Sequence, residues 1–415
     1  MEITANYNPP DSGPAARKFL ALGVIGLIVF GIGYTVNKTQ FYNSYLLAYI
    51  FWTNMALGAL MLTMLQHLTG GAWGVVSRRI LESATRTLWV MVPLILPILF
   101  GGMHSLYEWT HTDVVKADPI LIAKAPYLNE TFFIIRTVAY FVLWLGLITL
   151  LNRWSAQQDK SLESAVPATK SMRWISGPGL IVYALTMTFA SVDWMMSLDP
   201  HWYSTMYPVI FVVGQVLGTF TLLIITMVWL SGREPMSKYI TKAHIHDLGK
   251  LMLAFVMLWA YVSFSQFLIM WQGNVAEETP WYMIRKKDGW QYLAIVLFVF
   301  HFALPFLLLL SRDLKKNVRK LAAVAGLLMF MRYVDLFWLL RPRNEWMFEK
   351  AAEAHDKSGH VFGPHLTHSF TWMDFAALIG FGGVWLGFFL LELKKRPLLP
   401  VNDPNFEEAL NHVGH

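Results

Sequence analysis

The sequence contains no cysteine and few charged side chains. Of its 415 residues, 14% are Asp, Glu, Lys or Arg and 55% are hydrophobic, whereas a soluble domain usually carries about a quarter charged residues. Without cysteine, the chain cannot supply disulfides, thiolate zinc sites, iron–sulfur ligands or c-type haem attachment points. So few charges in so long a chain exclude an ordinary soluble domain.

Several familiar motifs are also missing. No helix-length segment carries two histidines at the spacing that holds stacked haems, and no phosphate loop or nucleotide fingerprint occurs. The spacing of His365, His368 and Asp374 resembles a metal site only weakly, and we expect no metal there. The net charge of +6 reflects where basic residues lie relative to a bilayer and does not predict nucleic-acid binding.

In place of charges the sequence has long apolar runs. A helix needs roughly 20 mostly apolar residues to cross a bilayer. Suitable windows lie near 18–36, 44–66, 87–103, 131–151, 177–196, 207–230, 250–270, 290–310, 321–340 and 372–393. Helices are expected because an open sheet would leave unpaired backbone groups in lipid. The sequence therefore predicts an all-α integral membrane protein, a single polytopic domain over 1–415 with about ten transmembrane helices.

Basic residues are divided unevenly between the predicted loops. Roughly two thirds of the 33 Lys and Arg lie in tails and loops on the side of the N-terminus, and basic loops normally stay in the cytoplasm. Both termini are therefore predicted to be cytoplasmic. The external loops 104–130, 271–289 and 341–371 have many Trp residues near their boundaries, which is typical of an interfacial belt. A docking surface for an external partner is the alternative.

Ionisable side chains inside a bilayer are costly, so each is a candidate functional residue. Asp193 lies about one turn from the outer end of the fifth window, and His201 follows shortly after it. A carboxylate and an imidazole at the membrane face could exchange protons or bracket a quinone head group. Asp199 precedes Pro200 as a helix cap would, so a structural role is expected for it.

Other ionisable residues lie deeper in the predicted helices. Arg332 and Asp335 are three residues apart and share a helical face, as a neutral ion pair or a proton relay station turned to the bundle interior. Arg136 lies near the outer edge of its window, where snorkelling to the interface is expected. His301 is mid-membrane, one turn before Pro305, which frees a backbone carbonyl. It is expected to be a hydrogen-bonded packing residue or a relay group.

The outer end of the seventh window is polar and could line a water-filled entrance. Gln266 lies in it, and Glu277 and Glu278 follow in what is expected to be a solvated loop. The proton-path candidates are Asp193, His201, Arg332, Asp335, His301, Arg136, Glu277 and Glu278. The quinone-site candidates are Asp193, His201 and Gln266.

Four stretches carry a resemblance to a known family. They are SVDWMMSLDPHWYSTMYP at 191–208, FSQFLIMWQGNVAEETPWY at 264–282, HFALPFLLLLSRDLK at 301–315 and PVNDPNFEEALNH at 400–412. In these stretches the chain resembles the F subunit of bacterial alternative complex III, a quinol:electron-acceptor oxidoreductase. That subunit belongs with the NrfD-like membrane anchors of polysulfide reductases. The residues carried over from the resemblance are Asp193, Asp199, His201, Gln266, Glu277, Glu278 and His301.

The resemblance implies a fold, a location and a set of partners. The fold would be two four-helix bundles flanked by the first and last helices, in the inner membrane of a bacterium. The chain would bind no cofactor and would not be catalytic alone. Its partners would be a sister NrfD-like membrane subunit, a periplasmic iron–sulfur protein, multihaem and monohaem cytochromes c and, as an optional addition, a terminal oxidase. Menaquinol or ubiquinol would be the substrate of the whole complex.

Three functions follow from these observations. The first is a cofactorless membrane subunit that scaffolds external redox subunits and conducts protons. The second is a subunit that binds quinol in its own right. The third is an ion-coupled secondary transporter that uses Asp193, Arg332 and Asp335. Transporters often have broken helices at matched positions in two halves, and the sequence shows no matched breaks.

Overall fold

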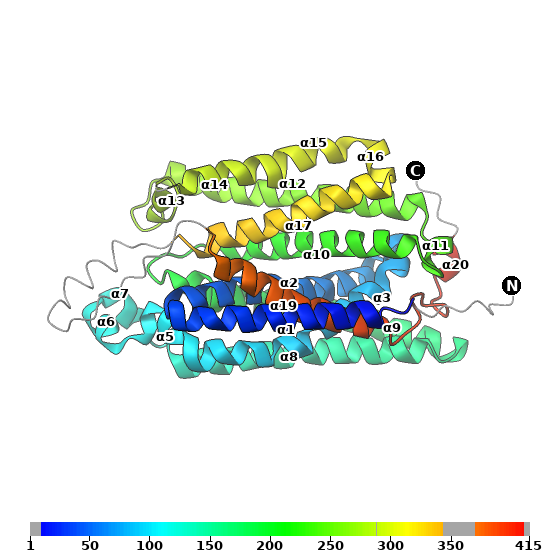
Figure 1. The fold of residues 1–415 in the computed structure, drawn as a ribbon, viewed down its shortest axis with the longest axis horizontal. Coiled ribbons are helices and arrows are strands. Elements are labelled where there is room, and N and C mark those ends of the chain that lie inside the picture. Colours follow the sequence, from blue (N-terminus) through cyan, green and yellow to red (C-terminus); the bar gives the residue numbers. More distant parts are fainter. Residues whose placement is uncertain (1–9, 288, 343–369, 411–415) are drawn as a thin grey trace.

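The computed structural model describes residues 10–287, 289–342 and 370–410. Within these ranges the secondary structure is helical and no strand occurs. The longer helices run side by side along one axis (Figure 1). In the described part of the chain, nine helices are long and apolar enough to cross a membrane, and a bent pair adds a tenth crossing if it is counted as one. The predicted all-helical, multi-pass architecture is thus confirmed.

The long helices agree with the predicted windows. They are α1 (Gly13–Val36), α2 (Lys38–Thr69), α8 (Glu130–Gln158), α9 (Leu162–Trp194), α10 (Tyr207–Ser231), α12 (Lys242–Gly273), α14 (Trp290–Leu297) continued by η5 (Phe298–Ala303) and α15 (Leu304–Leu310), α17 (Val318–Leu340) and α19 (Trp372–Leu393). Several are longer than predicted because their polar ends continue the helix beyond the apolar window.

Short helices connect the long ones. They are α3 (Ala72–Arg86), α4 (Leu88–Met91), α5 (Met103–Leu106), α6 (Thr112–Ala117), α7 (Pro119–Lys124), α11 (Met236–Tyr239), α13 (Pro280–Ile284), α16 (Arg312–Lys316) and α20 (Phe406–Leu410). We call the end of the molecule where α1 begins and α20 lies the termini end, and the opposite end, with α6, α7 and α13, the loop end (Figure 1).

The predicted window 87–103 is not one straight helix. The path turns by 48° at the break before Pro93, and a 3-10 turn and a π-helical turn follow. Pro93 and Pro97 have no N–H to donate, which interrupts the helical hydrogen bonds. The Tyr45 hydroxyl of α2 donates to the Leu94 carbonyl at 2.7 Å, so a neighbouring helix satisfies one of the backbone groups at the bend. Hydropathy alone does not predict such a bend.

For description, we divide the long helices from α2 to α17 into two groups in chain order. In the first group α2 contacts the bent α3–α5 segment and α9, and α9 contacts α8. In the second group α10 contacts α12 and α17, and the α14–α15 helix contacts both of those. Helices α2 and α10 join the groups, and α1 and α19 lie against each other beside α2. The last helix of the first group is α9, and that of the second group is α17.

Helices α1 and α19 approach at glycines. A Cβ added to Gly23 would lie 2.5 Å from the backbone nitrogen of Val384, and one added to Gly383 would lie 2.4 Å from the Gly23 Cα. Neither position has room for a side chain, and small residues of this kind let two membrane helices pack backbone to backbone. Gly31 on the same α1 helix has nothing within 4 Å of its would-be Cβ.

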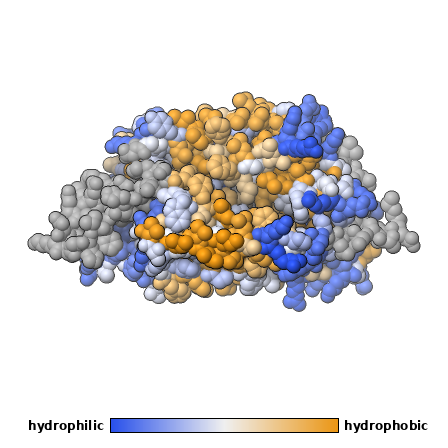
Figure 2. Space-filling view, in the orientation of Figure 1, coloured by the Kyte–Doolittle hydropathy of each residue, from blue (hydrophilic) through white to orange (hydrophobic). Residues whose placement is uncertain are grey.

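The surface is divided in the manner of a membrane protein. Figure 2 shows hydrophobic residues across the middle of the molecule and hydrophilic residues toward the two ends. Many large apolar side chains of the long helices are exposed there, for example Ile28 of α1 at 64%. A contiguous apolar surface of this kind requires lipid or partner helices around it.

A buried ion network fixes the C-terminal segment at the termini end. Arg78 of α3 donates to Asp403 at 2.5 Å and to Gln158 of α8 at 2.8 Å. Arg79, one residue on, pairs with Glu82 and with Asp159. The segment after α19 is therefore held against α3 and α8 by charge-assisted hydrogen bonds, which are stronger than neutral ones.

Candidate functional site

The first buried charge group, the Asp193 cluster, joins α8 and α9. Asp193 is 0% exposed, and its two carboxylate oxygens accept from Nε and Nη2 of Arg136, both at 2.9 Å. The Tyr140 hydroxyl donates to the same carboxylate at 2.7 Å. Arg136 also donates to the Tyr127 carbonyl at 2.9 Å. A bidentate pair with these added hydrogen bonds is the arrangement that makes a buried charge tolerable.

The expectation that Arg136 snorkels to the interface is wrong. Its guanidinium turns inward to Asp193 and lies under aromatic rings, 3.9 Å from the Tyr127 ring centroid and 4.3 Å from that of Phe132. The guanidinium binds the carboxylate on the next helix instead of water, because a guanidinium and a carboxylate fit each other in a bidentate pair. Sequence spacing could not show this, because Arg136 and Asp193 lie on different helices.

His201 does not join the Asp193 cluster. Its Nε2 lies 2.5 Å from a carboxylate oxygen of Asp118, the residue that caps α7. Burial by itself would raise the pKa of Asp118, but the hydrogen bonds from His201 and from backbone N–H groups outweigh it and lower that pKa. Lys124 of α7 donates to the Pro200 carbonyl at 2.6 Å. The two residues predicted to act together are thus in separate pairs, and the His201 pair ties two loops.

The second buried charge group, the Asp335 cluster, lies among α10, α12, α14–α15 and α17. Arg332 and Asp335 are 1% and 2% exposed and form the ion pair that their spacing predicts. The Trp259 indole of α12 donates to Asp335 at 3.3 Å, and Arg332 donates to the Phe211 carbonyl of α10 at 3.3 Å. Both side chains face the bundle interior, as predicted.

A glycine of α10 makes room for this pair. A Cβ at Gly214 would lie 2.3 Å from Nη1 of Arg332, so any larger residue would displace the guanidinium. By contrast, a Cβ at Gly218, one turn along α10, would first meet the flexible end of Met55 at 3.2 Å. Gly214 therefore sets the position of the Arg332 charge, a role that its sequence context does not reveal.

His301 completes the Asp335 cluster. Its ring centroid lies 4.1 Å from that of Trp259, and its backbone belongs to the π-helical turn η5, just before Pro305. The side chain is 0% exposed, and neither ring nitrogen has a hydrogen-bond partner among the described residues. The expected hydrogen-bonded packing role does not describe it, because a buried imidazole without partners is costly. Water or a transient proton donor would satisfy it.

Gln266 ties together parts of two resembling stretches. It accepts from the Ser204 hydroxyl at 3.1 Å and donates to the Tyr282 hydroxyl at 3.3 Å. Nearby, the indole of Trp202 donates to the Glu278 carbonyl at 3.2 Å and stacks on Trp281 with centroids 4.8 Å apart. The loop after α9 and the loop after α12 are thus one packed unit at the loop end.

Acidic residues of these loops have different settings. Glu277 is exposed and Glu278 is partly buried, in agreement with the solvated loop that was expected. Asp199 lines a small hollow of about 250 Å³ with Trp202, Tyr207 and Arg285. Sequence features alone do not link Arg285 to the other three residues, because two long helices, α10 and α12, separate it from them along the chain.

Arg285 is a buried cation that no sequence pattern singles out. Its guanidinium lies 3.3 Å from the Trp281 ring centroid and donates to the carbonyls of Trp281 at 2.9 Å and Leu339 at 3.1 Å. Burial lowers the pKa of Arg285 to about 9. The cation locks α13 to the end of α17, and Asp199 is a nearby carboxylate that opposes the shift.

A buried ion pair near the start of α19 was not predicted from the sequence either. Arg341 pairs with Asp374, which is 0% exposed. The Ser44 hydroxyl donates to the same carboxylate at 2.7 Å, and the backbone N–H of Thr371 donates at 2.8 Å. With these partners, Asp374 has a structural role. The histidines of the weak metal-like group, His365 and His368, lie outside the described residues.

A scan against protein-family models and a search of curated proteins both returned no match. The fold and the two clusters define a class: an all-helical, multi-pass protein whose apolar helices are long enough to span a membrane and bury paired charges.

Proposed function

We propose that this chain is the cofactorless membrane subunit of a quinol-oxidising complex of the alternative complex III type. In that role it scaffolds external iron–sulfur and cytochrome c subunits in a bacterial inner membrane, with both termini cytoplasmic, and carries part of a proton path. The packing of α2, α3–α5, α8 and α9 in one group and α10, α12, α14–α15 and α17 in another supports the two-bundle arrangement that the resemblance implies.

The observation that carries the proposal is the repeated placement of a buried carboxylate. The last long helix of each group holds a nearly inaccessible Asp paired with Arg, Asp193 on α9 and Asp335 on α17. A charge pair inside a membrane protein is costly and gives little net stability over apolar side chains. Its retention in both groups favours a function that uses a proton-accepting group.

The Asp335 cluster has the parts of a relay station. Arg332 pairs directly with Asp335, and protonation of Asp335 would weaken that pair and leave the guanidinium to the Phe211 carbonyl, which it already contacts. His301 lies on the other side of Trp259 with both ring nitrogens unpartnered in the described structure. A proton can move between these groups only through water, so the path requires hydration around η5.

The loop end has the rigidity that a scaffold needs. The stacked pair Trp202 and Trp281, the Gln266 hydrogen bonds and the Asp118–His201 pair hold the external loops to one another. Interfaces enriched in Trp and Tyr are typical of stable protein contacts. External redox subunits would dock on this end.

The test is genetic and enzymatic. Deleting this chain alone should abolish quinol:acceptor activity in isolated membranes, and a plasmid copy should restore it. In the fraction of complex that still assembles, Asp335→Asn should leave quinol oxidation intact but lower the protons released per electron. Full activity in the deletion strain would refute the proposal.

The other two functions have less support. The quinone-site candidates Asp193, His201 and Gln266 have separate hydrogen-bond partners, which are Arg136, Asp118 and Ser204 respectively. Unchanged quinol turnover after Asp193→Asn in an assembled complex would remove that alternative. For a transporter, the helix breaks fall in the second crossing of one group and the third of the other, so they are not matched. Substrate uptake by the chain alone in liposomes would favour it.

A further inference from the structure

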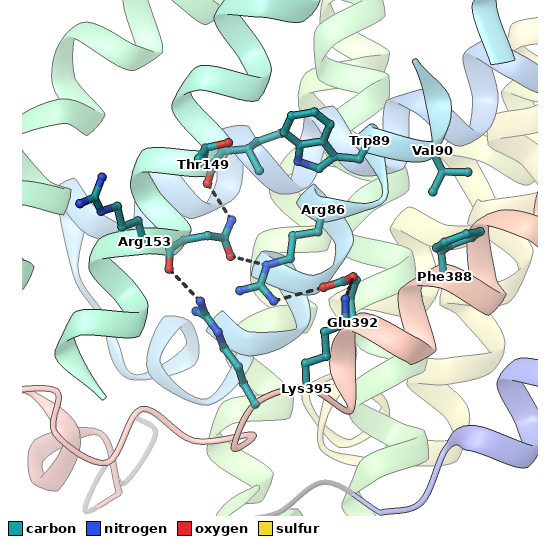
Figure 3. A pocket seen from close by; sticks show the side chains of 11 residues that line it. Arg86, Trp89, Val90, Thr149, Arg153, Phe388, Glu392 and Lys395 are labelled. Atoms are coloured by element: carbon teal, nitrogen blue, oxygen red, sulfur yellow. Dashed lines mark hydrogen bonds and ion pairs between the residues drawn. The ribbon is translucent and has the colours of Figure 1, made fainter. Parts of the chain in front are cut away.

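A basic hollow opens near the termini end, between α8 and α19. It has a volume of about 620 Å³, and residues of α3 and α4 also line it. Figure 3 shows Arg86 and Glu392 turned toward each other beside Lys395, with Trp89 and Phe388 nearby and the Arg153 side chain directed away from them. Its basic residues are Arg86, Arg153, Lys395 and Arg396, and Glu392 is the one carboxylate in its lining. The hollow therefore has more positive than negative charge.

The hydrogen bonds in the hollow do not satisfy every donor of these basic side chains. Arg86 pairs with Glu392 at 3.3 Å and donates to Asn152 at 2.8 Å, and Lys395 shares the same carboxylate. Arg396 donates to the Asn152 carbonyl at 3.0 Å, but its buried Nη1 has no hydrogen-bond partner in the described structure. That nitrogen is 3.8 Å from Glu82, which also pairs with Arg79.

The cations in the hollow also repel one another. Burial, followed by the nearby Arg86 guanidinium, lowers the pKa of Arg396, although Glu82 opposes this. Arg396 has an Nη1 without a hydrogen-bond partner in the described structure, a long contact to a Glu82 carboxylate that Arg79 already uses, and a second guanidinium beside it, so an anion would stabilise this position. Arg153 is exposed at the rim, where it can close over a bound group.

The apolar part of the lining continues toward the membrane. Trp89 of α4 is 55% exposed and Phe388 of α19 is 36% exposed, and both line the same hollow as the basic residues. A ligand that fits must be anionic at one end and apolar at the other. Basic pockets between membrane helices on the cytoplasmic side commonly hold acidic lipid head groups.

We propose that this hollow binds an acidic phospholipid of the surrounding leaflet. The phosphate lies between Arg396 and Arg153, with Arg86 and Lys395 released in part from Glu392. One acyl chain lies along Trp89 and Phe388. The bound lipid then bridges α4, α8 and α19, three elements that meet here through few direct polar contacts.

Native mass spectrometry of the purified full-length chain tests this site. Delipidated protein is titrated with phosphatidylglycerol, with phosphatidylethanolamine, and with inorganic phosphate as a competitor. Wild-type protein should retain phosphatidylglycerol in preference to phosphatidylethanolamine. The double variant Arg153→Gln/Lys395→Gln should lower the phosphatidylglycerol affinity by about tenfold, because both side chains are exposed and contribute charge to the hollow.

The matched control removes two cations elsewhere. Arg319→Gln/Lys320→Gln changes two exposed residues at the start of α17 and should leave the affinity unchanged. Trp89→Ala should weaken lipid binding because it removes a contact of the acyl chain. All three variants should keep the wild-type elution volume. Equal losses in the two double variants, or no lipid preference in wild type, would overturn the proposal. Displacement of the lipid by equimolar phosphate would assign the hollow to a free anion instead and would also overturn it.

Discussion

Arg136 of α8 binds both carboxylate oxygens of Asp193 on α9 at 2.9 Å, in a position with no exposure of the carboxylate. Breaking a buried pair leaves an uncompensated charge, so Asp193→Asn should destabilise the protein by on the order of 3–5 kcal/mol. Thermal unfolding of the detergent-solubilised chain measures this. Replacing both partners by apolar residues, Arg136→Met with Asp193→Leu, should recover most of the loss. If the single variant unfolds at the wild-type temperature, the pair is not formed as described.

The fit of Arg332 against Gly214 predicts a second effect. Gly214→Ala places a methyl group where the guanidinium lies, so it should move Arg332 away from Asp335 and lower proton release by the assembled complex. Gly218→Ala is the matched control on the same helix, because its methyl group would first meet the flexible end of Met55 at 3.2 Å and would lie at an ordinary contact distance, 3.5 Å, from Cγ of Arg332 rather than against the guanidinium. Proton release per electron is measured in proteoliposomes. Equal behaviour of the two variants would show that the guanidinium position does not matter.

The contact between α1 and α19 predicts a difference between two glycines of one helix. Gly23→Ala forces a Cβ against the backbone of α19 and should destabilise the protein by about 1–3 kcal/mol. Gly31→Ala meets open space and should leave stability unchanged or raise it slightly, because alanine favours helix more than glycine does. The unfolding temperatures of both variants in one detergent make the comparison. A larger loss at Gly31 would contradict the packing.

The Asp118–His201 pair predicts a pH-dependent loop. Hydrogen bonds hold the pKa of Asp118 below its ordinary value, so the pair stabilises the fold above the unfolded pKa near 3.9 and loses that contribution as pH falls through the folded pKa. Hydrogen exchange in residues 104–130, corrected for intrinsic rates, should therefore rise below about pH 4. Asp118→Asn keeps a residue able to cap α7 but removes the charge, and should exchange faster at neutral pH with little further change on acidification.

The sequence predicts the crossings well because hydropathy is a local property. Each of the other windows coincides with a helix to within two residues, and the main error of shape is at Pro93, where the path bends and the Tyr45 hydroxyl of α2 satisfies a backbone carbonyl. The pair Arg332 and Asp335 was predictable because both partners lie on one face of one helix. The Arg136–Asp193 and Arg341–Asp374 pairs were not, because each joins two helices whose contact no single-sequence pattern contains.

The most direct test of the proposed role is to identify what the chain binds in its own membrane. The full-length protein is tagged, extracted in a mild detergent and purified at low salt, and its companions are identified by mass spectrometry with a haem absorption spectrum of the same fraction. A tagged, unrelated multi-pass protein from the same membranes is the control. Our account predicts stoichiometric cytochrome c and iron–sulfur proteins together with a second polytopic subunit. A monodisperse, folded chain that elutes alone and without haem would contradict it.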